Sequence, residues 1–311
     1  MGKNQKINST PLYFMVNNIN NNMAKLWTPI FLPFGSLTNW YDSTDTTTLT
    51  LSTGDTVADW RDKSYDANNL SEADFADLPI YGTTNINGLS TVDFDGGTAV
   101  NLDDNSVNTP TDSNSNLYII YVGFNNTWTS TSTMFNFTNV AGDSMLLRNG
   151  GATTTQLLIK KGAAFNLNTN LTKPSDNRTV IYTIDCTDSS DVTLELNYTN
   201  AQTSPRNLAN NPGLYTNLTL GAQSIDLNGL NGQAGEFVVV QQANMTLEDK
   251  QKLEGYTAWK WGQVANLPGG HPYETAAPTV TDVEFRNKLY ETSTEEGSSR
   301  FRRLFELGFV G

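Results

Sequence analysis

The feature that most constrains the fold of this chain is a long series of short apolar segments from Trp40 to about Asn266, each broken by Gly, Asn, Asp or Pro. The clearest of them, which we predict to be strands, cover residues 117–124, 179–186, 192–198 and 235–240. In the third of these segments, apolar residues alternate with Thr, Glu and Asn, as in a sheet with one wet face. The run from Val238 to Val240 is apolar throughout, so we expect a central strand covered on both faces.

Many short strands without helices between them predict an antiparallel arrangement, because a parallel sheet would need crossover helices. Charged residues make up 16% of the chain, against roughly 25% in typical soluble proteins. Thr, Asn, Ser and Gly supply the polarity instead, which suits short strands and many turns. At 311 residues, one large all-β sandwich with extensions fits better than two equal domains.

One short helix is predicted after the last core strand. Thr246 is a suitable N-cap, Asp249 occupies the capping-box position, and Gly262 provides a stop. A helix at this point of the chain would close one end of the sandwich.

The two ends of the chain differ from its middle in composition. Residues 1–36 are predicted to be an irregular N-terminal arm, 37–277 the sandwich, and 278–311 a partly helical C-terminal tail. The tail gathers basic and apolar residues in an acidic chain, which is typical of a segment that packs on another chain. We predict an assembly tail; the alternative is a frayed tail or one folded back on its own sandwich. The residues expected to make the contact are Arg300, Phe301, Arg302, Arg303, Leu304 and Phe305.

The charge of the chain argues against two classes of partner. Its 19 Lys and Arg against 32 Asp and Glu give a formal charge of −13, which repels phosphate backbones and anionic lipid headgroups. No apolar stretch approaches the roughly 20 residues that span a bilayer. We therefore expect neither nucleic acid binding nor membrane insertion. The single cysteine, Cys186, excludes an intrachain disulfide and is expected to pack inside a strand.

Four runs of residues resemble a known fold family. Two lie early, at 40–45 (WYDSTD) and 57–64 (VADWRDKS), and two lie late, at 253–262 (LEGYTAWKWG) and 267–273 (LPGGHPY). In this order they resemble the opening and the ending of concanavalin A-like, laminin-G-like jelly-roll domains, over about residues 37–273. The resemblance implies a jelly-roll β-sandwich. Tyr65 stands where the family usually has Gly, so the turn there is expected to be reshaped.

Domains of this kind are common in bacteriophage virion proteins and in surface proteins of environmental bacteria. The resemblance therefore implies a non-enzymatic virion structural protein, as a capsid decoration, head fibre or tail appendage at the virion surface. Its partners would be other virion proteins or copies of itself in a homo-oligomer. The alternative is a glycan-binding adhesin on the bacterial extracellular surface, and host-surface glycans are candidate partners in both cases. Trp128, alone in a polar stretch, is the candidate sugar platform, with plain loop packing as the other interpretation.

A glucanase-like glycoside hydrolase is a further alternative, because the acidic run at 72–77 (EADFAD) superficially matches the pattern of that class. The run ends in Asp rather than Glu and leads into a predicted loop. A retaining glycosidase instead holds two carboxylates across the sugar on a rigid element. We therefore expect no enzyme activity and no catalytic residue.

The other motif residues are expected to stabilise the fold. Those predicted to lie in the core are Trp40, Trp60, Trp259 and Trp261. Those predicted to accept hydrogen bonds in turns are Asp42, Asp59 and Asp62, and His271 is predicted to cap a turn. No cofactor is expected, but calcium stays open at the Asp-rich runs 103–105 and 188–191, where solvated loop acids are the other interpretation. No metal ligand is assigned.

Overall fold

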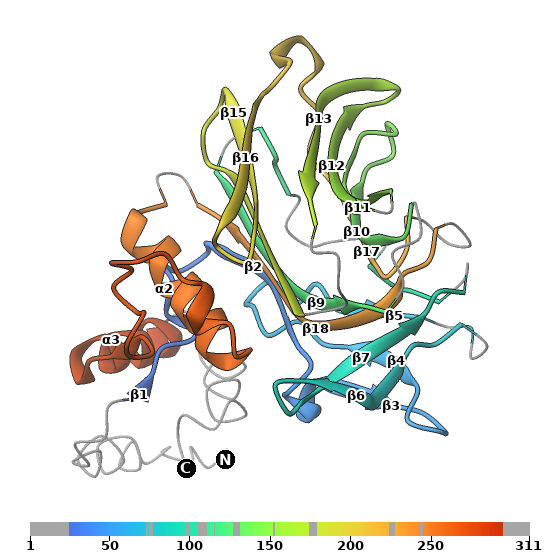
Figure 1. The fold of residues 1–311 in the computed structure, drawn as a ribbon. Coiled ribbons are helices and arrows are strands. Elements are labelled where there is room, and N and C mark those ends of the chain that lie inside the picture. The colour runs from blue at the N-terminus through green and yellow to red at the C-terminus, as the bar shows by residue number, and fades with distance from the viewer. Residues whose placement is uncertain are drawn as a thin grey trace, which may run out of the picture.

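The structure is a computed structural model. It describes residues 25–72, 74, 77–97, 100–104, 111–114, 116–126, 131–151, 153–173, 179–223, 228–242 and 245–294, with side chains as far as Lys288. Two antiparallel sheets lie face to face, and the helices gather on one side of the pair (Figure 1).

The two sheets are named here front and back. The front sheet has the strand order β13 (Ala164–Thr172), β12 (Thr154–Lys161), β11 (Ser144–Gly151), β10 (Thr133–Thr138), β17 (Asn217–Leu220), β8 (Leu102–Asp104), β5 (Leu70–Ser71), β4 (Val57–Trp60) and β3 (Leu49–Leu51). The back sheet has the order β16 (Asn200–Pro205), β15 (Asp191–Leu196), β14 (Thr179–Cys186), β9 (Leu117–Asn125), β18 (Asn231–Gln241), β7 (Leu89–Asp95) and β6 (Ile80–Ile86), with β2 (Leu37–Asp42) also paired to β18.

The remaining elements are short apart from the helices. A two-stranded ribbon joins β1 (Lys25–Leu26) to β19 (Thr279–Val280). The helices are α2 (Leu247–Lys260) and α3 (Asp282–Thr294), with 3-10 turns η1 (Pro29–Phe31), η2 (Thr46–Thr48), η3 (Leu208–Asn210) and η4 (Val264–Asn266). Neither α2 nor α3 is long and apolar enough to cross a membrane, and they are the only α-helices in the described ranges.

The main core lies between the two sheets, and β18 shows how the pleat builds it. Phe237 and Val239 point into this core, while Val238 and Val240 point to the opposite side of the back sheet. All four side chains are fully buried, which confirms the prediction of a central strand covered on both faces. At one edge the sheets are joined, because the Thr169 and Ser204 hydroxyls of β13 and β16 lie 2.8 Å apart.

The predicted fold class is confirmed: the protein is an all-β antiparallel sandwich with a short helix after the last core strand. The predicted strands correspond to β9, β14, β15 and β18. The predicted helix is α2, in which Thr246 and Asp249 form the capping box and Gly262 follows with a φ of +72°. Cys186 is fully buried in β14, as expected for a packed strand residue.

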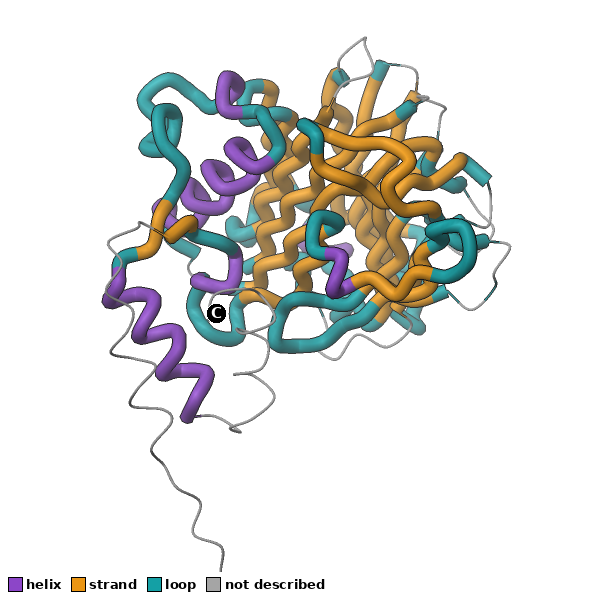
Figure 2. Tube along the Cα trace, turned by 90° about the horizontal axis from the view of Figure 1, so that it is seen from below, coloured by secondary structure: helices purple, strands orange, loops and turns teal. Residues whose placement is uncertain are grey.

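A second apolar cluster lies on the outer side of the back sheet, under a layer made by α2, α3 and the segment 25–32 (Figure 2). Trp27 and Phe285 are buried in this cluster although they come from opposite ends of the chain. The Trp27 amide donates to the Pro278 carbonyl at 2.9 Å, and the Lys288 ammonium donates to the Leu32 carbonyl at 2.8 Å. The described ends of the expected arm and tail therefore pack together against the sandwich.

The tryptophan predictions are confirmed for three positions and wrong for one. Trp40, Trp60 and Trp261 are almost fully buried, whereas Trp259 is 39% exposed. The reason is helical geometry: Thr257 of α2 and Trp261, the residue that directly follows α2, face the sheet, and a residue midway between them points away from it. The indole nitrogen of Trp259 instead donates to the Tyr273 carbonyl at 2.8 Å.

These two environments predict different costs for the same substitution. Trp60→Ala should lower the free energy of unfolding by about 3 to 5 kcal/mol, because it empties a fully buried site. Trp259→Ala should cost well under half of that, since much of the ring already contacts water. Urea denaturation followed by tryptophan fluorescence measures both. Equal losses for the two variants would contradict the described packing.

Candidate functional site

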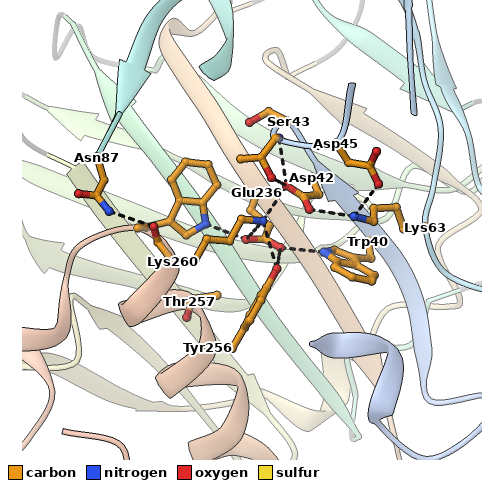
Figure 3. Close-up of polar contacts among 12 residues, drawn as sticks. Trp40, Asp42, Ser43, Asp45, Lys63, Asn87, Glu236, Tyr256, Thr257 and Lys260 are labelled. Carbon is orange, nitrogen blue, oxygen red and sulfur yellow. Dashed lines mark hydrogen bonds and ion pairs between the residues drawn. The ribbon is translucent and has the colours of Figure 1, made fainter. Parts of the chain in front are cut away.

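The most concentrated set of polar contacts surrounds Glu236, which is fully buried on β18 (Figure 3). Its carboxylate accepts hydrogen bonds from the indole nitrogens of Trp40 and Trp261, each at 2.7 Å, and from the Tyr256 hydroxyl at 2.8 Å. A buried carboxylate requires such partners, because an unpaired charge in the interior is strongly unfavourable.

Lysine side chains complete the set. The Lys260 ammonium lies 3.2 Å from Glu236 and 2.7 Å from Asp42, and the Lys63 ammonium lies 2.9 Å from both Asp42 and Asp45. Burial alone would raise the pKa of Asp42, but the charges of Lys260 and Lys63 outweigh it and hold that pKa well below its usual range. We call this set of six polar partners around Glu236 and Asp42 the buried clasp: Trp40, Lys63, Tyr256, Lys260, Trp261 and Asp45.

The buried clasp links separate elements of the fold. Its carboxylates are occupied by protein donors, and Glu236 has no exposed surface. It ties α2 to β18 and β2, and thereby holds the outer layer on the back sheet.

Removing the central carboxylate should therefore be costly. Glu236→Ala leaves two indole donors and a tyrosine hydroxyl without their acceptor and should lower the free energy of unfolding by about 3 kcal/mol or more. The matched control is Glu248→Ala, which removes an exposed ion pair between two residues of α2, Glu248 and Lys252. That control should change stability by about 0.5 kcal/mol or less. A cost for Glu236→Ala no larger than for the control would exclude a stabilising role for the clasp.

A second set of residues lies on the outer face of the front sheet, away from the helices. One row crosses the sheet, with each member paired to the next by strand register. In order, the row contains Asp59, Ser71, Asp103, Thr219, Asn136, Leu146, Leu158 and Asn168. The residues on either side of these positions point into the main core, so the row itself faces outward.

The middle of this row holds polar groups that are deeply set. The Thr219 hydroxyl donates to Asp103 at 2.7 Å, and the Asn136 side-chain amide donates to the Gln223 carbonyl. The Asn136 side chain is 4% exposed, yet its Oδ1 has no hydrogen-bond partner among the described residues. Because this oxygen is buried, a water held inside the protein could satisfy it, whereas a ligand on the surface does not reach it.

One end of the face carries an ordered chain of side chains over β11, β12 and β13. The Arg148 Nε donates to the Gln156 Oε1 at 2.9 Å, and the Gln156 Nε2 donates to the Asn168 Oδ1 at 2.9 Å. Burial lowers the pKa of Arg148, and no carboxylate among the described residues pairs with it. Further along, the Lys160 ammonium lies 5.2 Å from the ring centroid of Phe165, which is 45% exposed.

A third polar set lies under α2 at its outer edge. Glu254 accepts from the Tyr118 hydroxyl at 2.9 Å and lies 3.2 Å from the His271 Nε2, while Lys250 lies 2.6 Å from Asp185. Burial, helped by the charges of Glu254 and Asp185, raises the pKa of Glu195 to about 7.

In the described ranges, no three carboxylate, histidine or cysteine side chains come close enough to hold a metal ion.

The raised pKa of Glu195 predicts a pH effect on stability. The folded state holds this proton more tightly than the unfolded state, whose value is 4.5, so its contribution is lost as the pH rises from about 4.5 to about 7. Glu195→Gln should therefore raise stability relative to wild type above pH 7, by on the order of 1 kcal/mol because solvent screens the partly exposed group. Chemical denaturation at pH 5 and pH 8 measures the difference. If the difference in free energy of unfolding between wild type and Glu195→Gln is the same at both pH values, this pH effect is ruled out.

The predicted site residues are placed as follows. Trp128 and the residues Arg300, Phe301, Arg302, Arg303, Leu304 and Phe305 lie outside the described residues. Glu72 directly follows the two-residue strand β5, so it is not held within a long central strand. Its carboxylate accepts a hydrogen bond from the Asp74 amide at 2.9 Å. Of the Asp residues considered for calcium, Asp188 accepts from the Ser190 amide and Asp103 from Thr219, as described above.

The turn predictions are confirmed at most positions. Asp62 accepts from the amides of Trp40 and Ser64, each at 2.8 Å, and His271 accepts from the Tyr273 amide through Nδ1 at 3.2 Å. The prediction is wrong for Asp59, because this residue lies inside β4 with its side chain on the outer face of the front sheet.

Sequence reasoning missed Glu236 and Arg148. A signal existed for Glu236, since it is the one charged residue in the apolar segment 235–240. A signal existed for Arg148 too, because no Asp or Glu occurs between Asp143 and Asp176 in a strongly acidic chain.

Comparison with known proteins supports the fold and goes no further. No protein-family model and no curated protein matches this chain. Among solved structures, it is similar to the binding domain of botulinum neurotoxin serotype D, with 13% identity, a TM-score of 0.50, and coverage of 74% of this chain and 51% of that one. A variant of HCR/D matches with 11% identity, a TM-score of 0.50 and coverage of 74% and 52%. Domain 4 of AbnA, an extracellular arabinanase from Geobacillus stearothermophilus, in complex with arabinotriose, matches with 14% identity, a TM-score of 0.46 and coverage of 70% and 98%. The chain spans about half the length of the first two structures.

Proposed function

We propose that this protein is a non-enzymatic display module, attached through its chain ends and exposing the outer face of its front sheet. The observation that carries the proposal is the pairing of β1 with β19, with Lys25 opposite Val280. This pairing brings the two ends of the sandwich together on the α2 side. The front sheet lies on the other side of the molecule (Figure 1).

The layer that holds the ends is firmly built, which suits an attachment point. The Lys25 ammonium lies 3.2 Å from the ring centroid of Phe285, and Lys252 of α2 pairs with Glu284 of α3 at 3.5 Å.

The assembly that we propose is a bacteriophage virion, in which the module would act as a capsid decoration, fibre or tail appendage. This placement rests on the resemblance of the sequence motifs to domains found in such particles. The partners would be other virion proteins or further copies of the chain, contacted through residues 1–24 and 295–311.

The second candidate function is glycan binding, and the outer face of the front sheet favours it. Open amide and guanidinium groups beside an exposed aromatic ring are what a protein uses to bind sugar hydroxyls and sugar ring faces. The terminal nitrogens of Arg148, the exposed amides of Asn168 and Asn170 and the exposed ring of Phe165 are such groups.

The attachment proposal predicts the effect of two truncations. Deleting residues 295–311 should leave the thermal midpoint nearly unchanged, because the role that we propose for this segment is attachment and not folding, and α3 and its contacts are kept. Deleting from residue 279 should lower it, because the deletion also removes Val280 and Phe285 from the second apolar cluster. The shorter deletion should nevertheless abolish oligomer formation or incorporation into particles.

The measurements are calorimetric melting and mass spectrometry of purified particles or size-exclusion profiles. Normal assembly of the variant lacking residues 295–311 and of a variant lacking 1–24 would contradict attachment through the ends.

A further inference from the structure

The strands β11, β12 and β13 form a basic region in an acidic protein. Residues 144–173 contain Arg148, Lys160, Lys161 and Lys173 and no Asp or Glu, in a chain whose formal charge is −13. A local excess of positive charge against such a background gives this part of the surface a different electrostatic character from the rest.

Strand register organises the outward side chains of this region into a regular grid. Along β12, the outward positions are Gln156, Leu158 and Lys160, but Leu158 is only 1% exposed, so the accessible side chains are those of Gln156 and Lys160. Each of these β12 residues pairs with one residue on β11 and one on β13. Gln156 lies between Arg148 and Asn170, Leu158 between Leu146 and Asn168, and Lys160 between Ser144 and Phe165. At about 3.3 Å per residue, the positions of Gln156 and Lys160 lie about 13 Å apart, the length of a short oligosaccharide.

Arg148 is fixed through its Nε, and its two terminal nitrogens are available to bind a ligand. Its Nε is fixed by Gln156, and Gln156 is fixed in turn by Asn168. Its two terminal nitrogens make no hydrogen bond or ion pair with the described residues. The two terminal nitrogens of a partly desolvated guanidinium match the geometry of a carboxylate or sulfate group, which they can bind through two parallel hydrogen bonds.

The other end of the grid offers a different kind of contact. The Phe165 ring is 45% exposed and has the Lys160 ammonium near its face. An exposed aromatic ring stacks on the apolar C–H face of a sugar, and a lysine beside it adds a second positive charge. Asn168 and Asn170 are exposed at the rim, where their amides can bond to hydroxyls.

We propose that the outer face of β11, β12 and β13 binds an anionic polysaccharide, with Arg148 pairing with its carboxylate or sulfate groups and Phe165 stacking on a sugar ring. The proposal rests on the glycan-binding candidate function and names its ligand class and residues. We favour a polysaccharide over a nucleic acid or a lipid surface because the exposed Phe165 ring can stack on the apolar face of a sugar. The amides of the grid also suit a ligand rich in hydroxyl groups.

The test uses the full chain and soluble polysaccharides in calorimetric titration at low and high salt. The probes are alginate and hyaluronan for carboxylates, chondroitin sulfate for sulfates, and dextran as the uncharged polymer. We expect binding to one or more of the anionic probes, weakened by salt, and none to dextran.

The affinities of substituted proteins test whether the polysaccharide binds at the outer face of β11, β12 and β13. Arg148→Gln should weaken binding at least about tenfold, because a charge-assisted pair is lost. Arg148→Lys should retain part of the affinity, since lysine keeps the positive charge but lacks the paired nitrogens of the guanidinium. The matched control is Arg286→Gln, the same change of charge at an exposed position on α3, which should bind as wild type does. Lys160→Gln and Phe165→Ala should each give smaller losses.

Three outcomes with the anionic probes and their controls would overturn the proposal. They are equal losses for Arg148→Gln and Arg286→Gln, binding to none of the anionic probes, and equal binding to single-stranded DNA or to phosphatidylserine vesicles. Binding to dextran that does not depend on Arg148 would also overturn it, while leaving glycan binding itself standing. Attachment through the chain ends is tested separately by particle incorporation, so the two proposals can fail independently.

Discussion

The interaction on which the rest of this structure depends is the buried contact of Glu236 with its donors. A fully buried carboxylate in a central strand is tolerated only where strong donors surround it, and here α2 and β2 supply them. Because these donors come from separate segments, their geometry fixes the helix against the back sheet. The layer that carries both chain ends then packs on that helix, through Trp27 against Tyr256 and Lys252 against Glu284.

This arrangement gives the sandwich two unlike sides. The outer face of the back sheet is covered by apolar packing and by the segments that lead to both ends of the chain. The outer face of the front sheet carries polar and basic side chains, among them Arg148, whose terminal nitrogens make no hydrogen bond with the described residues. A module built in this way can be held on one side while it binds on the other, which joins the attachment and glycan-binding proposals in one geometry.

Much of the fold could be predicted from local pattern. The period of two in β15, the apolar run in β18 and the capping box of α2 are short-range signals, and each describes its element correctly. Long-range partners could not be found in this way. Trp40 lies 196 positions before Glu236, and the facing of Trp259 depends on which side of α2 meets the sheet. The run without Asp or Glu marks the region around Arg148 in the sequence, but only strand register shows that Gln156 lies beside it.

The most direct measurement of this two-sided organisation is hydroxyl-radical footprinting of the full chain with and without an anionic polysaccharide that binds it. Phe165 and Trp259 provide a matched pair, since they are 45% and 39% exposed on opposite sides of the molecule. We expect the ligand to protect Phe165 from oxidation and to leave Trp259 as reactive as before. Protection of Trp259 with Phe165 unchanged would place the ligand on the helical side and contradict the assignment of the front sheet as the binding face.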